Sequence, residues 1–141
     1  MMIWKTGTAA ALLMVGVLIG GMGGCMKFNK GPEMSERLKN APPIRLDDSQ
    51  DVHILVMQAP NPGWSFWIER DERTRDGMRV YLTMRRPDPT MLYPQVIVEK
   101  NLRTGVRTET PIQIYGRVLE FEESTRGRGH ALIKPVDSFQ E

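Results

Sequence analysis

The chain has 141 residues and a formal charge of +2 at pH 7, with 26% charged and 40% hydrophobic residues. This balance is typical of a folded domain and excludes an intrinsically disordered chain, and the near-neutral charge gives no reason to expect nucleic acid as a partner. Cys25 is the single cysteine, so a disulfide framework and a cysteine-based zinc site are both excluded.

Residues 1–24 have the pattern of a secretory signal peptide. Lys5 supplies a short positive start, an uncharged stretch with an apolar centre follows, and glycines precede Cys25. The four residues Met22-Gly23-Gly24-Cys25 resemble the lipobox of bacterial lipoproteins, although methionine stands where leucine is typical. The resemblance implies cleavage before Cys25, a diacylglyceryl thioether on its thiol and an acyl chain such as palmitate on its amine.

The resemblance also predicts a location in the cell envelope, anchored by lipid. Met26 follows Cys25 where an aspartate would retain a Gram-negative lipoprotein at the inner membrane, so the outer membrane is favoured, with the protein facing the periplasm. Two alternatives stay open. The uncharged run is nearly as long as a membrane span, so it could remain as a single-pass anchor, or an ordinary signal peptidase could cut nearby.

Residues 25–50 are predicted to be a lipidated N-terminus followed by a flexible tether. The segment is rich in prolines and charges, and residues 35–40 could form at most a helical turn. From Val52 onward, short apolar and alternating segments separated by Pro and Gly turns predict strands. The predicted strands are 52–57, 64–70, 78–85, 95–100, 106–108, 112–122 and 130–134.

The segment 78–85 alternates most clearly, with Met78, Val80, Leu82 and Met84 on one side of the predicted strand. Asp76-Gly77 before it predicts a tight hairpin. Arg103-Thr104-Gly105 is expected to turn, and Gly116 is expected to form a β-bulge. The fold class is therefore an all-β domain over residues 51–136, a small antiparallel sandwich or open barrel that could be immunoglobulin-like, with a polar tail at 137–141.

A partner-binding patch is predicted where two of these strands would pair. Trp67 falls on the polar side of its strand, and Tyr81 and Arg79 share the polar side of the next. Aromatic residues and arginine are enriched at protein interfaces. The alternative is that Trp67 belongs to a second layer of core.

The sequence shows no catalytic motif, so we expect no enzyme, no cofactor and no metal. His53 and His130 are isolated from each other and from any ligand-spaced partner, and His53 lies within an apolar run typical of a buried structural histidine. An enzyme acting on cell-wall or lipid material is the alternative from a different class.

Residues 61–98 also resemble the C-terminal domain of PrcB-type protease-complex proteins. The resemblance rests on Gly63-Trp64-Ser65, the strand from Met78, the proline loop and Tyr93-Pro94 with its apolar continuation, although Gln95 stands where the family often has a second tyrosine. It implies a small β-fold that supports another protein. We therefore expect a non-catalytic domain for protein binding or envelope assembly, with an accessory or inhibitor of an extracytoplasmic protease as the alternative.

Overall fold

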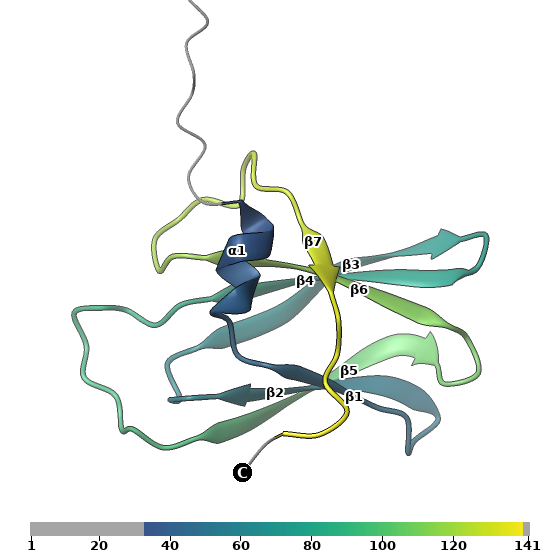
Figure 1. Ribbon diagram of the computed structural model, residues 1–141, viewed down its shortest axis with the longest axis horizontal. Helices are drawn as coiled ribbons and strands as arrows, with labels where there is room; N and C mark the ends of the chain where they lie inside the picture. The colour runs from purple at the N-terminus through teal and green to yellow at the C-terminus, as the bar shows by residue number, and fades with distance from the viewer. Residues whose placement is uncertain (1–32, 140–141) are drawn as a thin grey trace, which may run out of the picture.

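Two β-sheets account for most of the folded chain (Figure 1). The structure, a computed structural model, describes residues 33–139. In chain order its elements are α1 (Met34–Lys39), β1 (Ile44–Asp47), β2 (Val52–Ala59), β3 (Ser65–Thr74), β4 (Gly77–Arg85), β5 (Val98–Arg107), β6 (Ile112–Leu119) and β7 (Ala131–Ile133). Sheet A has the order β1-β2-β5 and sheet B the order β3-β4-β6-β7. They share one core, which confirms the predicted all-β sandwich.

The alternation along β4 builds the centre of this core. Val80, Leu82 and Met84 are at most 1% exposed, and they pack in one cluster with Leu55 and Met57 of β2. Burying a side chain of this size stabilises the fold by about 1.5–3 kcal/mol. Apolar packing between the sheets therefore holds the sandwich together.

One strand pair in sheet B differs from the expected antiparallel arrangement. β3 and β4 form the predicted hairpin, but β4 and β6 are parallel, with Met78 opposite Ile112 and Arg85 opposite Leu119. After β4 the chain crosses to sheet A as β5 and then returns to sheet B as β6 (Figure 1). Because it has passed through the other sheet, it enters β6 in the same direction as β4. A short hairpin would have forced antiparallel pairing.

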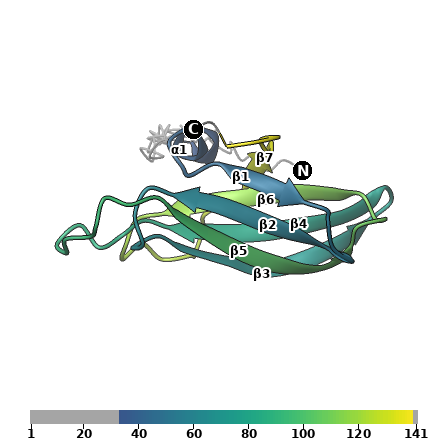
Figure 2. The same cartoon turned by 90° about the horizontal axis from the view of Figure 1, so that it is seen from below.

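The folded region begins before residue 51, within the segment predicted to be a tether. Residues 34–39 form α1, and residues 44–47 form β1 at the edge of sheet A. Met34 and Leu38 are four positions apart, so they share a helix face, and both pack against the core. Figure 2 shows α1, β1 and β7 together along one edge of the sandwich, with β3 and β5 along the other.

Two predictions based on glycine are wrong. The chain does not turn at Arg103-Thr104-Gly105, because β5 runs unbroken through them and the buried Thr104 hydroxyl donates to the His53 carbonyl at 2.7 Å. Gly116 forms no bulge, since the β4–β6 register continues through it. A side chain at Gly116 would overlap Ile133 of β7. This glycine therefore makes room for close packing between strands.

Candidate functional site

The three residues predicted to form a patch all lie on the outer face of sheet B. Alternate residues of β4 face the core, so Arg79 and Tyr81 point outward, and Trp67 of β3 pairs with the outward-facing Thr83. All three predicted residues are half-buried. Cys25, the predicted lipidation site, lies outside the described residues.

An arginine–tyrosine array, made of Arg70, Arg79, Tyr81 and Tyr115, crosses this outer face. Tyr81 and Tyr115 are opposite each other in the β4–β6 register, and their rings stack with 5.5 Å between centroids and 29° between planes. The guanidinium carbon of Arg70 lies 4.0 Å from the Tyr81 ring centroid, and that of Arg79 lies 5.5 Å from the Tyr115 centroid. Each cation–π contact contributes about 0.5–1 kcal/mol at an exposed site, which favours one arrangement of these side chains.

Two members of the array, Arg70 and Tyr115, were not predicted from the sequence. Plain alternation from Trp67 would place Arg70 on the inner side of β3. The register shifts between Ile68 and Arg70, so one extra residue, Glu69, is accommodated and Arg70 pairs with Tyr81 on the outside. Bulges redirect side chains in this way. Tyr115 reaches Tyr81 only through the parallel pairing of β4 with β6, which was not expected.

Trp67 lies on the same face of sheet B, next to the array along β3 and β4. Its register partner is Thr83, two positions along β4 from Tyr81. The Arg85 guanidinium carbon lies 5.8 Å from the Trp67 ring centroid, and Arg85 donates to the Phe121 carbonyl at 2.6 Å. The structure thus places Trp67 on the same face as the array but in contact with a different arginine.

A buried polar cluster, which we name the Glu69 network, lies between Trp67 and the array. Arg117 donates from Nη2 to Glu69 Oε1 and from Nε to the Thr83 hydroxyl at 2.9 Å, and that hydroxyl donates to Glu69 Oε1 at 2.6 Å. His130 Nε2 lies 3.0 Å from Glu69 Oε2. Thr83 is fully buried, and Arg117 is 6% exposed. Neither the ion pair nor the hydroxyl is therefore open to a ligand.

The Glu69 network holds the loop between β6 and β7 on the sheet. Arg117 Nη1 donates to the carbonyl oxygens of Thr125 at 2.8 Å and Arg128 at 3.0 Å, both in this loop. A second ion pair fixes the loop to α1, since Arg37 Nη1 lies 2.6 Å from Glu123 Oε2. These contacts are structural, because every charged group in them has a partner within the fold.

Burial and neighbouring charges shift the pKa values of three groups around this loop. Burial alone would raise the pKa of Glu69, but hydrogen bonds from Thr83 and Arg117 and the Arg117 charge outweigh it and lower the pKa. Burial likewise opposes the lowering of the Glu123 pKa by Arg37. Burial and the Arg117 charge lower the pKa of His130, against the weaker opposite effect of Glu69.

Acid is expected to destabilise the fold in two pH ranges. Because the pKa of His130 is lower in the folded chain, its stabilising contribution is complete above about pH 6.5 and is lost as the pH falls from there through the folded pKa. The lowered pKa values of Glu69 and Glu123 mean that their contributions are present above about pH 4.5 and are lost as the pH falls further. Urea unfolding at pH 7.5, 5.5 and 3.5 measures both losses.

The substitution His130→Gln serves as the control for this pH dependence. In this variant the free energy of unfolding should change little between pH 7.5 and 5.5. It should still fall below pH 4.5, because that fall comes from protonation of the carboxylates. A wild-type free energy of unfolding that stays level between pH 7.5 and 5.5 would contradict the role given to His130.

His53 is the buried structural histidine that its apolar surroundings predicted. It is 3% exposed, and Nδ1 lies 2.5 Å from Asp48 Oδ1 while Nε2 lies 2.8 Å from the Thr110 carbonyl oxygen. Both ring nitrogens are thus occupied, and the ring joins β2 to the turns before β2 and after β5.

An apolar arm, residues 86–97, connects β4 to β5 and extends beyond the sheets in both views (Figures 1 and 2). Leu92 is 99% exposed there, and Met91 is also largely exposed. Tyr93 fixes the base of the arm against Gly63, where an added Cβ would come within 2.7 Å of the tyrosine ring. A pocket of about 610 Å³ separates the arm from residues 120–122.

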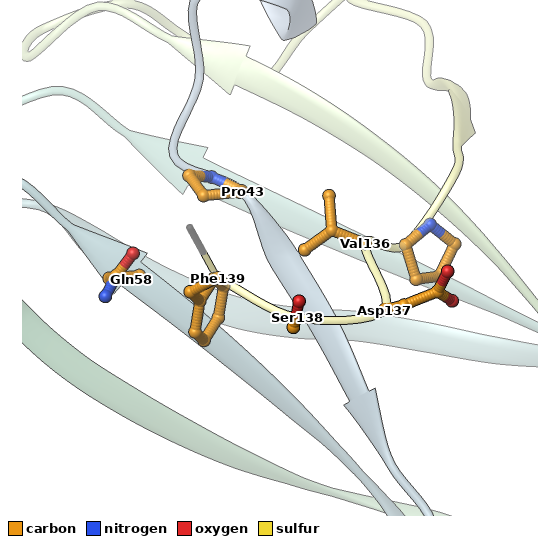
Figure 3. Close-up of a pocket in the computed structure, with 7 residues that line it drawn as sticks. Pro43, Gln58, Val136, Asp137, Ser138 and Phe139 are labelled. Atoms are coloured by element: carbon orange, nitrogen blue, oxygen red, sulfur yellow. The ribbon is translucent and has the colours of Figure 1, made fainter. Parts of the chain in front are cut away.

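The C-terminal segment crosses β1 and closes a second pocket of about 570 Å³ (Figure 3). Val136 N donates to the Ile44 carbonyl at 2.9 Å, and the Arg45 guanidinium carbon lies 5.6 Å from the Phe139 ring centroid. Asp137 and Ser138 line the pocket together with Pro43 and Gln58.

The described residues contain neither a metal-binding cluster nor a membrane-spanning helix. Within residues 33–139, no group of three His, Cys, Asp or Glu is placed to hold a metal ion, and no helix is long and apolar enough to cross a membrane. The likeness of residues 61–98 to PrcB-type domains stays a prediction. No protein-family model matches the chain, and the comparisons with curated proteins and with solved structures give no match.

Proposed function

We propose that the protein is a lipid-anchored component of the bacterial cell envelope whose β-sandwich binds a protein partner through the outer face of sheet B. The lipid on Cys25 holds it at a membrane, the outer membrane being favoured by Met26. The domain performs no chemistry, and it recruits or positions its partner in envelope assembly.

The residues exposed on the outer face of sheet B support a binding role. Tyrosine, tryptophan and arginine contribute most of the binding energy at protein interfaces, and this face carries all three. Their mutual contacts hold the side chains in place before a partner arrives. Less conformational entropy is then lost when the partner binds.

The position of α1 supports a partner close to the membrane. The described fold begins at Glu33, eight residues after Cys25. Eight residues reach about 28 Å when fully extended, which is far less than the 25-residue tether predicted from the sequence would allow. A lipid on Cys25 therefore restricts the sandwich to partners in or beside the same membrane.

Photo-crosslinking in a bacterial host tests this function. A photoreactive residue at Ser65, which is exposed on the outer face of sheet B beside Trp67, should crosslink to a specific envelope protein. The matched position is Asn101, exposed on β5 in sheet A, which should give no such product. The chain isolated from membranes should begin at Cys25 and carry the mass of its acyl groups. Cys25→Ala should lose that acyl mass and should keep residues 1–24.

The substitution Trp67→Ala separates binding from folding. We expect it to abolish the Ser65 crosslink while changing the free energy of unfolding by no more than about 1 kcal/mol, because Trp67 is only half-buried. A loss of several kcal/mol would instead assign Trp67 to the core. A crosslink to a protease would favour the accessory or inhibitor role over general envelope assembly.

A further inference from the structure

We propose that the arginine–tyrosine array binds an acidic segment of a protein partner. This inference rests on the proposed function in taking the outer face of sheet B as the binding surface, and it adds the chemistry of what binds there. The positive charge of the array, the placement of its donors and the residues around it each support this partner.

The array carries positive charge that the fold neutralises only in part. Arg70 and Arg79 form no ion pair within 4.0 Å in the described residues, whereas Arg117 is paired with Glu69 and Arg37 with Glu123. Glu72 is the register partner of Arg79 on β3, and its carboxylate accepts from the Tyr81 hydroxyl at 3.2 Å. Two arginines thus face one carboxylate, and the net positive charge that remains can attract carboxylates from outside the described fold.

The two guanidinium groups of the array suit carboxylates as ligands. A guanidinium that lies over an aromatic ring keeps its N–H groups at its edges, where a carboxylate can bind two of them at once. Arg79 Nε is buried, so a carboxylate from outside reaches this guanidinium through its terminal nitrogens.

An exposed apolar side chain lies next to the charged groups. Leu132 of β7 pairs with Tyr115 across the β6–β7 ladder and is 59% exposed. The surface therefore suits a segment in which acidic residues accompany an apolar one. Sugar chains fit less well, because they stack on open aromatic faces and the Tyr81 ring is covered by Arg70 on one side and by Tyr115.

Fluorescence anisotropy of a labelled hexaglutamate peptide tests the proposal on the full chain in non-ionic detergent at low salt. We expect saturable binding that weakens as salt is added, with little binding of hexaglutamine. The double substitution Arg70→Gln/Arg79→Gln should weaken binding at least about tenfold, since two charge-assisted contacts are lost. Arg75→Gln/Arg107→Gln removes the same charge from exposed positions outside the array and should weaken binding less than about twofold.

Equal binding of hexaglutamine, or equal losses in the two double variants, would overturn the proposal. Binding to phosphatidylglycerol vesicles that requires Arg70 and Arg79, without binding of hexaglutamate, would assign the array to anionic lipid instead. The Ser65 crosslink separates this proposal from the proposed function. If the crosslink persists in the Arg70→Gln/Arg79→Gln chain, the outer face of sheet B binds a partner, but the array does not bind an acidic segment of it. If the crosslink is absent from the wild-type chain, the outer face of sheet B is not the binding surface.

Discussion

Arg117→Met is expected to lower the free energy of unfolding by about 3–5 kcal/mol, because removing one partner strands a buried charge. Glu69 would keep a side chain that is only 17% exposed without its cation. The carbonyl oxygens of Thr125 and Arg128 would lose the donor that holds the β6–β7 loop. Urea unfolding at pH 7.5 measures the loss. Trypsin cleavage after Arg126 should also become faster, because the loop is released.

Two further variants test this explanation. Arg103→Met removes an arginine of the exposed pair with Asp51 and should cost no more than about 1 kcal/mol. Adding Glu69→Gln to Arg117→Met should recover part of the loss, because the stranded charge is then gone. If the double variant is less stable than Arg117→Met alone, the cost does not come from an unpaired Glu69.

Gly77→Ala should lower the free energy of unfolding by at least about 2 kcal/mol, the second large effect we expect. Gly77 has φ +149°, a conformation that side chains rarely adopt, and an added Cβ would overlap the Pro111 carbonyl oxygen. That oxygen accepts from Met78 N at 2.9 Å, next to the first pair of the parallel β4–β6 ladder. The alanine would therefore disturb both the hairpin and the ladder.

Gly105→Ala is the matched control for this substitution. Gly105 is also a strand glycine, but it lacks a positive φ, and the nearest atom to an added Cβ is 3.9 Å away. Alanine there should be neutral or should stabilise the fold by up to about 1 kcal/mol, since it restricts the unfolded chain. Equal losses at the two glycines would show that neither φ nor Pro111 explains the effect at Gly77.

Local patterns predicted the sandwich and the inner face of β4 because both depend on neighbouring residues. The alternation from Met78 to Met84 requires only that one face be buried, and Asp76-Gly77 requires only a tight turn. The sequence predicted α1 only as a possible helical turn at residues 35–40 within a tether, because its two core contacts, Met34 and Leu38, stand among charges. These two side chains stabilise the helix only by packing against a core that is formed by strands much later in the chain.

Only the part of the candidate site that depends on local patterns could be predicted from the sequence. Tyr81, Arg79 and Trp67 follow from alternation along single strands, and the structure places them on one face. Arg70 reaches that face through a register shift, and Tyr115 through parallel pairing with a distant strand. Neither the register shift nor the parallel pairing produces a pattern in the local sequence, because both are determined by how the strands and sheets pack together.

The first and last elements of the fold are in contact, and this affects how the chain folds as it emerges. α1 contacts β7, and Val136 N is bonded to Ile44 O, so residues near the start are covered by residues near position 136. The chain is made from its N-terminus and crosses the membrane in that order if it is exported, so β1 emerges well before the segment that covers it. An unpaired strand edge and exposed Met34 and Leu38 invite aggregation in that interval. A chaperone that holds the emerging chain until its last strand is free would therefore raise the yield of folded protein.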